Sequence, residues 1–476
     1  MISFIIGVAA LVLGYLLYGK FVEKIFGIEP ARSTPAVAKY DGVDYVQMGW
    51  KKAMLIQFLN IAGVGPIFGA IAGAMWGPWA FVWIVLGSIF AGATHDYLSG
   101  MISLRNNGAS LSEIVGKYLG PGALYFIRFF SVLVLILVGV VFVTSPALIL
   151  EKLIDPTANK STIYFILLAV IIAYYVLATL LPIDKIIGRI YPVFGAALLI
   201  MGVGIFITLF TSGEIGNVPE FTFANLHPKS EMIFPALFIT IACGAISGFH
   251  ATQSPMMARC VKSEIDGRKV FYGAMILEGF VALIWAAAAM AHFGGQEGLA
   301  AAGPGPVVVN KVSLGLMGSF GGILAILGVV ACPITSGDTA FRSARLTLAD
   351  WFKIEQKPMR NRLLIAIPLF AIGVVLCFVD FGIIWRYFGW ANQTLATFAL
   401  WAGAAYLVLH NKNYWPALIP AVFMTCVVVS YICIAGIGFG LPYTVGIAVG
   451  VVVAALSFVW FFWAHVNKAS ATNPVA

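Results

Sequence analysis

Four ionisable side chains stand inside long apolar stretches of this sequence of 476 residues, where an ionised group is costly. His95 and Asp96 are neighbours, His250 lies in a glycine-rich stretch, and Glu278 lies in the apolar string MILEGFVALIW. Because an imidazole gains and loses a proton near neutral pH, these residues suit proton transfer. Structural roles are the alternative: a polar helix end for His95 and Asp96, a cap on free carbonyl groups for His250, and a polar partner on a neighbouring helix for Glu278.

The stretch from residue 50 to residue 76 is long and apolar enough to cross a bilayer, yet its middle reads NIAGVGP. Pro66 removes a helical hydrogen bond, and Gly63 and Gly65 weaken the helix beside Asn60. Backbone groups freed at membrane depth must be satisfied by protein or by a water-filled cavity, and secondary transporters hold substrate and coupling ion at such breaks. A kink that serves packing alone is the alternative.

A second interrupted stretch covers residues 232–257, and its middle reads CGAISGFHATQSP. Glycines and a proline interrupt this helix, and polar groups among them suit substrate binding. The residues concerned are Gly244, Ser247, Gly248, His250, Gln253 and Pro255. We expect residues 60–66 and 244–255 to be non-helical and to lie within a few ångströms of each other.

The two interrupted stretches enter the membrane from opposite sides, and each is followed by four more apolar spans, so they indicate an inverted repeat. The predicted fold is an all-α polytopic membrane protein with a LeuT-like arrangement of five plus five helices. One extra helix precedes this core and two follow it, which gives about thirteen spans, residues 314–348 among them. The predicted divisions are 1–48 (extra helix and loop), 49–211 (first repeat), 232–410 (second repeat) and 411–476 (C-terminal helices).

The composition excludes a soluble globular protein, because 61% of the residues are hydrophobic and only 10% are charged. The first apolar run, residues 2–17, has no basic start and no cleavage site, and it is predicted to be a retained helix. The six cysteines show no metal-ligand spacing and no disulfide framework, so they are predicted to be small buried core residues. The net charge of +8 is scattered over loops and does not indicate nucleic-acid binding.

The distribution of Lys and Arg sets the predicted orientation. With the N-terminus outside and the C-terminus in the cytoplasm, 23 of the 28 basic residues fall on the cytoplasmic side. The loops 19–48 and 349–362 are then cytoplasmic. The predicted location is the inner or plasma membrane of a bacterium or archaeon.

Several strings resemble the carbon starvation protein A family, in order along nearly the whole chain. They are DGVDYV (41–46), AGVGPIFGAIAG (62–73), AGATHDY (91–97), RNNGASLSEIVG (105–116), ACGAISGFHATQSP (242–255), SGDTAFRSARLTLAD (336–350) and FGWANQTLA (388–396). The resemblance implies the amino acid–polyamine–organocation superfamily, a LeuT-like core, and proton-coupled import of pyruvate or of peptides. This chain is shorter than many members, and it has Val64 where a proline is often found, so the substrate stays open.

Under this resemblance the substrate contacts backbone and side chains at the two breaks, and Asn392 and Gln393 lie beside the cavity. The predicted substrate-binding residues are Asn60, Gly63, Gly65, Pro66, Gly244, Ser247, Gly248, His250, Gln253, Asn392 and Gln393. The predicted proton-coupling residues are His95, Asp96, His250, Glu278 and Asp338. Asn392 and Gln393 have an alternative role as caps on the aromatic run 385–390.

Sodium coupling is an alternative, because hard cations prefer oxygen ligands and four such side chains follow Pro333. They are Thr335, Ser336, Asp338 and Thr339. Asp338 has a further alternative as the partner of Arg342 or Arg345.

Other function classes fit the sequence less well. An intramembrane enzyme would need a constellation such as GxGD or HExxH, and the sequence contains neither. A channel would need a repeated filter, and a nutrient sensor would need a signalling partner. The sequence predicts no cofactor, and it predicts protons, a small carboxylate or peptide, and the lipid bilayer as partners, with the oligomeric state left open.

Overall fold

The structure is a computed structural model that describes residues 1–42, 45–155, 157–158, 160–180, 184–356 and 358–467. The side chains of residues 179–192, 332, 335, 338 and 350 lie outside the described part. Within these ranges the regular structure is helical, apart from one isolated bridge between Met48 and Val261. The predicted all-α fold is therefore confirmed.

The elements of the first half run in the order α1 (Ile2–Leu13), η1 (Gly14–Tyr18), α2 (Gly19–Phe26), α3 (Pro35–Ala38), α4 (Trp50–Ile61), α5 (Val64–Gly73), η2 (Ala74–Trp76), α6 (Trp79–Leu86), η3 (Gly87–Gly92), α7 (Ala93–Arg105), α8 (Leu111–Leu119), α9 (Pro121–Ile154), α10 (Thr162–Leu180), α11 (Asp184–Thr211) and η4 (Glu214–Asn217). The second half adds α12 (Ile233–Thr240), α13 (Gly248–Ala258), η5 (Glu264–Asp266), η6 (Arg268–Tyr272), α14 (Gly273–His292), α15 (Gln296–Ala302), α16 (Gly305–Ala325), η7 (Ile326–Ala331), α17 (Cys332–Phe352), α18 (Met359–Cys377), α19 (Phe381–Leu409), α20 (Trp415–Ile434), α21 (Tyr443–Phe461) and η8 (Phe462–Val466).

Nine of the described helical spans are long and apolar enough to cross a membrane, and the bent pair α4 and α5 makes up to ten. This protein is therefore a polytopic membrane protein. α12 and α13 have only 8 and 11 residues, so neither can span a bilayer by itself. The count of about thirteen spans stays a prediction.

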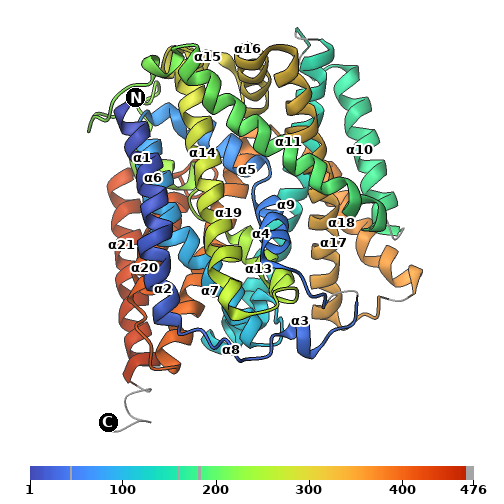
Figure 1. The fold of residues 1–476 in the computed structure, drawn as a ribbon, viewed down its shortest axis with the longest axis vertical. Helices are drawn as coiled ribbons and strands as arrows, with labels where there is room; N and C mark the ends of the chain where they lie inside the picture. The colour runs from blue at the N-terminus through green and yellow to red at the C-terminus, as the bar shows by residue number, and fades with distance from the viewer. Residues whose placement is uncertain (43–44, 156, 159, 181–183, 357, 468–476) are drawn as a thin grey trace.

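The interrupted helices lie at the centre of the molecule. α5 packs against α14 and α12, and α13 packs against α7 and α19. Figure 1 shows α5, α13 and α19 in the middle, with α20 and α21 at one edge and α10 and α18 at the opposite edge. This arrangement encloses both breaks in protein, as unpaired backbone at membrane depth requires.

The first break is shorter than expected. α4 continues to Ile61 and α5 starts at Val64, so only residues 62–63 are non-helical, and the two helices meet at an angle of 51°. Pro66 is the third residue of α5. A proline is tolerated there because the first N–H groups of a helix have no intrahelical acceptor. The prediction of a non-helical segment over the whole of 60–66 is wrong, although the break falls inside it.

The second break covers residues 241–247, and it is displaced from the predicted 244–255. α13 is helical from Gly248 to Ala258 and contains Pro255 in its interior. An internal proline removes one hydrogen bond and can kink a helix without ending it. The prediction for residues 248–255 is therefore wrong.

The predicted single span 314–348 is also interrupted. Gly318 has φ +59° and ψ −149°, a conformation that side chains other than glycine rarely adopt, and the helix axis changes direction there. After Gly318 the helix continues to Ala325 and then through η7 into α17. The candidate membrane span here is Gly305–Ala331, which begins before residue 314.

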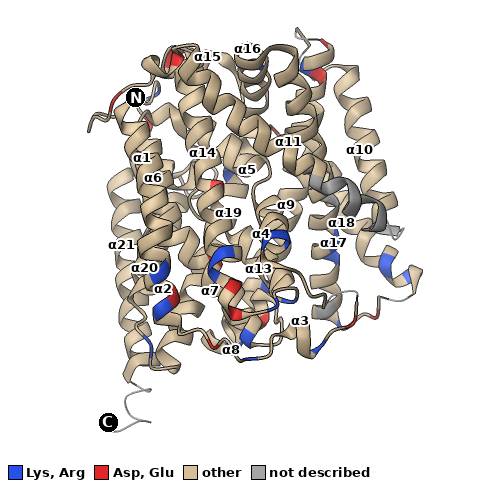
Figure 2. Cartoon of the chain, in the orientation of Figure 1, with Lys and Arg blue, Asp and Glu red and all other residues tan. Residues whose placement is uncertain are grey.

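Lys and Arg are concentrated toward one end of the molecule (Figure 2). Figure 2 shows most Lys and Arg near the lower end, beside α2, α7 and α8, whereas the middle of the helices is mostly tan. α1 begins at the upper end and α21 ends at the lower end (Figure 1). This pattern is what an embedded protein with one basic face presents.

Candidate functional site

The start of α5, directly after the first break, touches the second break. A Cβ atom built on Gly65 would lie 2.5 Å from the Cys243 sulfur, and one built on Gly244 would lie 3.5 Å from the Pro66 Cα atom. Gly244 also has φ +89°, a conformation that favours glycine. The prediction that the breaks lie within a few ångströms of each other is confirmed. These glycines bring two backbone segments together at the centre of the protein.

A line of four titratable side chains crosses this junction. His95 Nδ1 lies 2.7 Å from one Asp96 oxygen, and His250 Nδ1 lies 3.0 Å from the other. His250 Nε2 then lies 3.3 Å from a Glu278 oxygen. All four side chains are fully buried, with 0% exposure. The line joins α7, α13 and α14, whose residues are up to 183 positions apart in the sequence.

The structure gives His250 a role other than capping carbonyl groups. Trp83 Nε1 donates to the Ile241 carbonyl at 3.1 Å, and the Ser88 hydroxyl donates to the Gly244 carbonyl at 2.8 Å. These two side chains satisfy carbonyl groups of the second break, whereas His250 faces two carboxylates. His95 and Asp96 are likewise buried, and they are not a polar helix end at the membrane surface.

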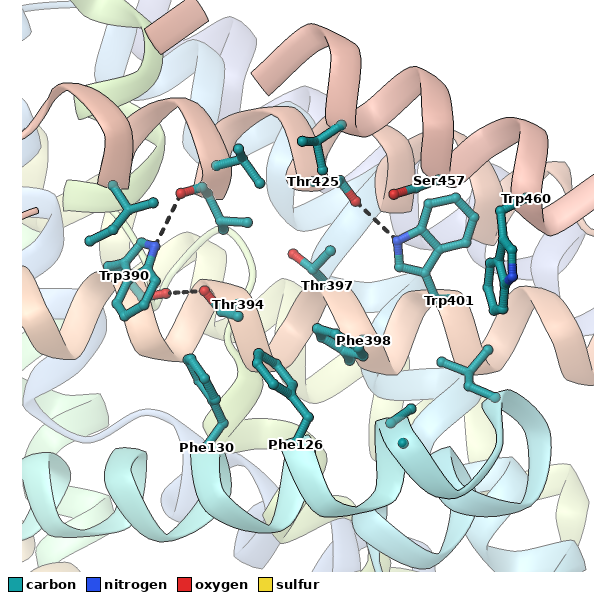
Figure 3. A pocket seen from close by; sticks show the side chains of 17 residues that line it. Phe126, Phe130, Trp390, Thr394, Thr397, Phe398, Trp401, Thr425, Ser457 and Trp460 are labelled. Carbon is teal, nitrogen blue, oxygen red and sulfur yellow. Dashed lines mark hydrogen bonds between the residues drawn. The ribbon is translucent and has the colours of Figure 1, made fainter. Parts of the chain in front are cut away.

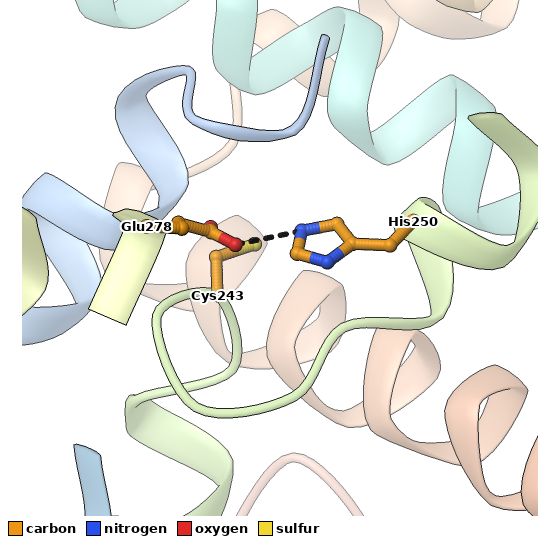
Figure 4. Close-up of side chains that lie close together, drawn as sticks. All are labelled: Cys243, His250 and Glu278. Carbon is orange, nitrogen blue, oxygen red and sulfur yellow. Dashed lines mark ion pairs between the residues drawn. The ribbon is translucent and has the colours of Figure 1, made fainter. Parts of the chain in front are cut away.

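Glu278 and His250 keep unused binding capacity. Within the described part of the chain, the Glu278 carboxylate oxygens and His250 Nε2 are buried and make no hydrogen bond, and His250 Nε2 and one Glu278 oxygen form a 3.3 Å ion pair. Cys243 lies beside them, and ligand atoms from these three residues all lie within 4.8 Å of one another (Figure 4). Thiolate, imidazole and carboxylate are the ligands of zinc-type sites, so this set can hold a metal ion.

Asn392 on α19 fixes the start of α13. Its side-chain oxygen accepts a hydrogen bond from the Phe249 N–H at 2.7 Å, and its amide group donates to the Ser247 hydroxyl at 2.9 Å. Gly248 lets α13 approach α19, because a Cβ there would lie 2.3 Å from the Asn392 carbonyl oxygen. Asn392 therefore contacts the break and does not cap the run 385–390.

The other predicted substrate residues make contacts of their own. Gln393 donates to the Phe238 carbonyl at 3.1 Å, and its side-chain oxygen is buried without a partner among the described residues. Gln253 donates to Thr252 at 3.1 Å. A Cβ on Gly63 would lie 3.2 Å from the Phe142 ring, so that glycine packs against α9. Asn60 is in the last turn of α4.

The predicted sodium ligands lie on α17. The side chains of Thr335 and Asp338 fall outside the described residues. Ser336 is buried, and Thr339 is partly buried. Arg342, an alternative partner of Asp338, donates to the Ala178 carbonyl at 3.0 Å. The sodium site therefore stays a prediction.

Sequence reasoning missed Cys243, Trp83 and Ser88. Cys243 precedes His250 by seven residues across a non-helical segment, and Glu278 comes from another helix, so no regular spacing joins the three. Trp83 and Ser88 act through single hydrogen bonds to backbone that only the three-dimensional arrangement reveals.

A separate cavity of about 630 Å³ lies between α9, α19, α20 and α21 (Figure 3). Two of its polar side chains are bonded within its wall: Trp401 donates to Thr425 at 3.0 Å, and Trp390 donates to the Val428 carbonyl at 3.1 Å. Aromatic and aliphatic side chains form the rest of its wall. Among the described residues, this cavity has no charged side chain in its wall, whereas the junction gathers four buried titratable side chains, so the junction is the better candidate site.

The arrangement is that of LeuT-fold membrane transporters. A manganese transporter of Eremococcus coleocola superposes with a TM-score of 0.52 at 12% identity, over 92% of this chain and 99% of that chain. The structure of MhsT in complex with L-phenylalanine superposes with a TM-score of 0.55 at 13% identity, over 88% of this chain and 99% of that chain. At such identities the likeness establishes the fold alone.

The chain belongs to the carbon starvation protein CstA family, whose family model matches residues 1–190, 165–293 and 284–431. An uncharacterized membrane protein of Haemophilus influenzae is 45% identical over 63% of this chain and 93% of its own length. The peptide transporter CstA of Bacillus subtilis is 28% identical over 87% of each chain. The pyruvate/proton symporter BtsT of Escherichia coli is 29% identical over 58% of this chain and 47% of its own length. The predicted family is thus confirmed.

Proposed function

We propose that this chain is a secondary transporter that imports a small carboxylate such as pyruvate, or a peptide, by proton symport. The observation that carries the proposal is the position of His250, which lies between the buried carboxylates of Asp96 and Glu278 where the two breaks meet. The relatives named above, a peptide transporter and a pyruvate/proton symporter, support the substrate class and the coupling ion.

The half-helices provide the counterpart for a substrate carboxylate. α5 and α13 both start at the junction, and the N-terminus of a helix carries the positive end of the helix dipole and N–H groups without an intrahelical acceptor. In α13 one of these N–H groups, that of Phe249, already donates to Asn392, so the start of α5 is the more open of the two. Co-import of one proton cancels the charge of a monocarboxylate, which otherwise has to move against an inside-negative potential worth about 2.3 kcal/mol per 100 mV. A proton carrier beside the carboxylate site meets this need.

The remaining predicted features belong to the same proposal. The core has five plus five helices in an inverted repeat, with one helix before it and α20 and α21 after it. The protein lies in the inner or plasma membrane of a bacterium or archaeon, with the N-terminus outside and the C-terminus in the cytoplasm. Rocking of the interrupted helices against the surrounding scaffold alternates access to the junction.

Uptake by proteoliposomes tests the proposal. The purified chain is reconstituted, and uptake of labelled pyruvate is followed with and without an inside-alkaline pH gradient, with unlabelled dipeptide as competitor. We expect the gradient to drive accumulation, and we expect His250→Gln to bind substrate but to lose the response to the gradient. His292→Gln is the matched control, because His292 lies at the end of α14 and pairs with Glu214 at 3.2 Å.

Two results would reject the coupling mechanism. Normal gradient-driven accumulation by His250→Gln would make His250 structural. Uptake that requires sodium and ignores the pH gradient would favour the oxygen-rich residues of α17. If neither pyruvate nor peptide is transported by the wild type, the alternative of a membrane nutrient sensor is favoured.

A further inference from the structure

We propose that Cys243, His250 and Glu278 form a binding site for a zinc-class divalent metal ion. The ligand atoms are the Cys243 sulfur, His250 Nε2 and one Glu278 oxygen, and they converge from the second break, from α13 and from α14 (Figure 4). The site does not depend on the transport proposal, because it follows from the positions of these atoms alone.

The spacing of the ligand atoms fits such an ion. A tetrahedral ion about 2.0–2.3 Å from each ligand holds the ligand atoms roughly 3.3–3.7 Å apart. His250 Nε2 and the Glu278 oxygen are 3.3 Å apart, and all three ligand atoms lie within 4.8 Å of one another. Small side-chain rotations therefore complete the coordination.

The His250 nitrogen that would not bind the metal, Nδ1, contacts a carboxylate, as is usual for metal-binding histidines. Asp96 lies 3.0 Å from His250 Nδ1, which fixes the proton on that nitrogen and leaves Nε2 with its lone pair toward Cys243 and Glu278. Carboxylate–histidine–metal arrangements of this kind orient the ring and strengthen the ligand. His95, at 2.7 Å from Asp96, positions the carboxylate in turn.

The charge of the site also fits. A divalent ion with one thiolate, one carboxylate and one neutral imidazole has no net charge, which suits a fully buried position. Binding releases the thiol proton of Cys243 to solvent. Three protein ligands leave a fourth position open, as in zinc sites that exchange a ligand.

A bound metal ion would link the second break to α14. It would also coordinate His250 Nε2, the atom that carries the proton in the proposed coupling. The metal would therefore block proton-coupled transport. Cys243 separates the two roles, because it is a ligand for the metal and has no part in the proposed proton route.

Cobalt spectroscopy tests the site directly. The metal-stripped protein is titrated with Co²⁺, whose bond to a thiolate gives a near-ultraviolet charge-transfer band. We expect one Co²⁺ per chain, the thiolate band, and a rise in Tm. Cys243→Ser should abolish the band and the rise in Tm, and Cys433→Ser, a buried cysteine on α20, should leave both unchanged. Asp96→Asn should keep the band but weaken Co²⁺ binding by roughly 10- to 100-fold, as loss of the group that orients a ligand histidine does.

A second measurement covers slow entry of the metal into a closed protein. The wild type and Cys243→Ser are purified from cells grown with zinc, and their zinc content is determined by elemental analysis. We expect about one zinc per wild-type chain, as a three-ligand site holds one ion, and much less in the variant. Absence of both the thiolate band and the bound zinc in the wild type would overturn the proposal, as would a band that survives in Cys243→Ser.

Transport then links the site to function. Zn²⁺ should inhibit uptake by the wild type, and Cys243→Ser should resist it at least tenfold. Equal inhibition of the two proteins would remove the blocking role. If the wild type transports nothing, the proposed function fails while the cobalt and zinc results still decide the metal site.

Discussion

At the scale of single residues, the junction depends on a missing side chain. Gly65 occupies a position where a Cβ atom would lie 2.5 Å from the sulfur and 2.7 Å from the Cβ atom of Cys243. Such distances are shorter than any ordinary contact, so a larger residue would push the two breaks apart.

Gly65→Ala should therefore destabilise the folded protein by about 1–3 kcal/mol, the usual effect of overpacking a tight interior. Thermal unfolding in detergent measures it as a lower Tm. Gly122→Ala on α9 is the control, because a Cβ there meets no atom within 4 Å. Equal Tm values for the two variants would show that the breaks can separate without loss of stability.

His227 makes a residue-scale prediction about pH. It lies in the segment before α12, its ring is 4.4 Å from that of Trp76, and burial lowers its pKa below the ordinary value. The unfolded segment then binds a proton more readily than the folded one, so stability falls as pH drops below about 6.5.

We expect hydrogen exchange of residues 221–231, corrected for the intrinsic rate, to be faster at pH 5.5 than at pH 7.5. His227→Gln should remove this difference, since glutamine does not titrate. Identical protection at the two pH values in the wild type would contradict the prediction.

At the scale of elements, a buried ion pair between α7 and η5 also holds the backbone of the segment after α2. Arg105, the last residue of α7, donates to both oxygens of Glu264 at 2.9 and 2.8 Å, and also to the Gly27 carbonyl at 2.7 Å. The Glu264 side chain is 0% exposed, and its carboxylate also accepts from the Glu29 N–H at 2.7 Å. Arg105 and Glu264 thus hold the backbone of Gly27 and Glu29 against the helical core.

Glu264→Gln should destabilise the protein by about 3 kcal/mol, because removing one partner of a buried ion pair leaves the other charge uncompensated. Limited proteolysis of residues 30–48 should become faster. Glu29→Gln is the matched control: Glu29 also pairs with Arg105, at 3.4 Å, but is exposed, so it should change Tm little. An unchanged Tm in Glu264→Gln would show that the segment is held by other contacts.

The sequence located the interrupted helices but did not define their ends. Glycine and proline content identified both regions, since these residues weaken helices wherever they occur. The ends depend on tertiary contacts: Asn392 starts α13 at Gly248, and Pro255 stays helical inside a packed environment. Gly318 gave no distinct signal among the other glycines of its span.

At the scale of the whole molecule, the distribution of Lys and Arg predicts which side faces the cytoplasm. Cysteines introduced at exposed Lys353 and Lys229 test it in cells, in a background without reactive native cysteines. An impermeant maleimide added outside should label position 229 and leave position 353 unlabelled until the cells are opened. The reverse pattern would invert the orientation.

The candidate site was only partly predictable, because its residues come from helices that meet only in the folded molecule. Each of His95, Asp96, His250 and Glu278 is conspicuous in the sequence because it is ionisable within apolar surroundings. Their alignment into one line depends on how α7, α13 and α14 pack, which no local pattern encodes. Cys243 was overlooked because a buried cysteine is ordinary until two other ligands meet it.

The contact between Gly65 and Cys243 has a consequence for how this family can diverge. The two positions share one small volume, so the chain can enlarge one of them only by reducing the other. Relatives that carry alanine or serine at the position of Gly65 should carry glycine at that of Cys243 and should have lost the thiol. A family member can therefore keep either the thiol at the position of Cys243 or a larger side chain at the position of Gly65, but not both.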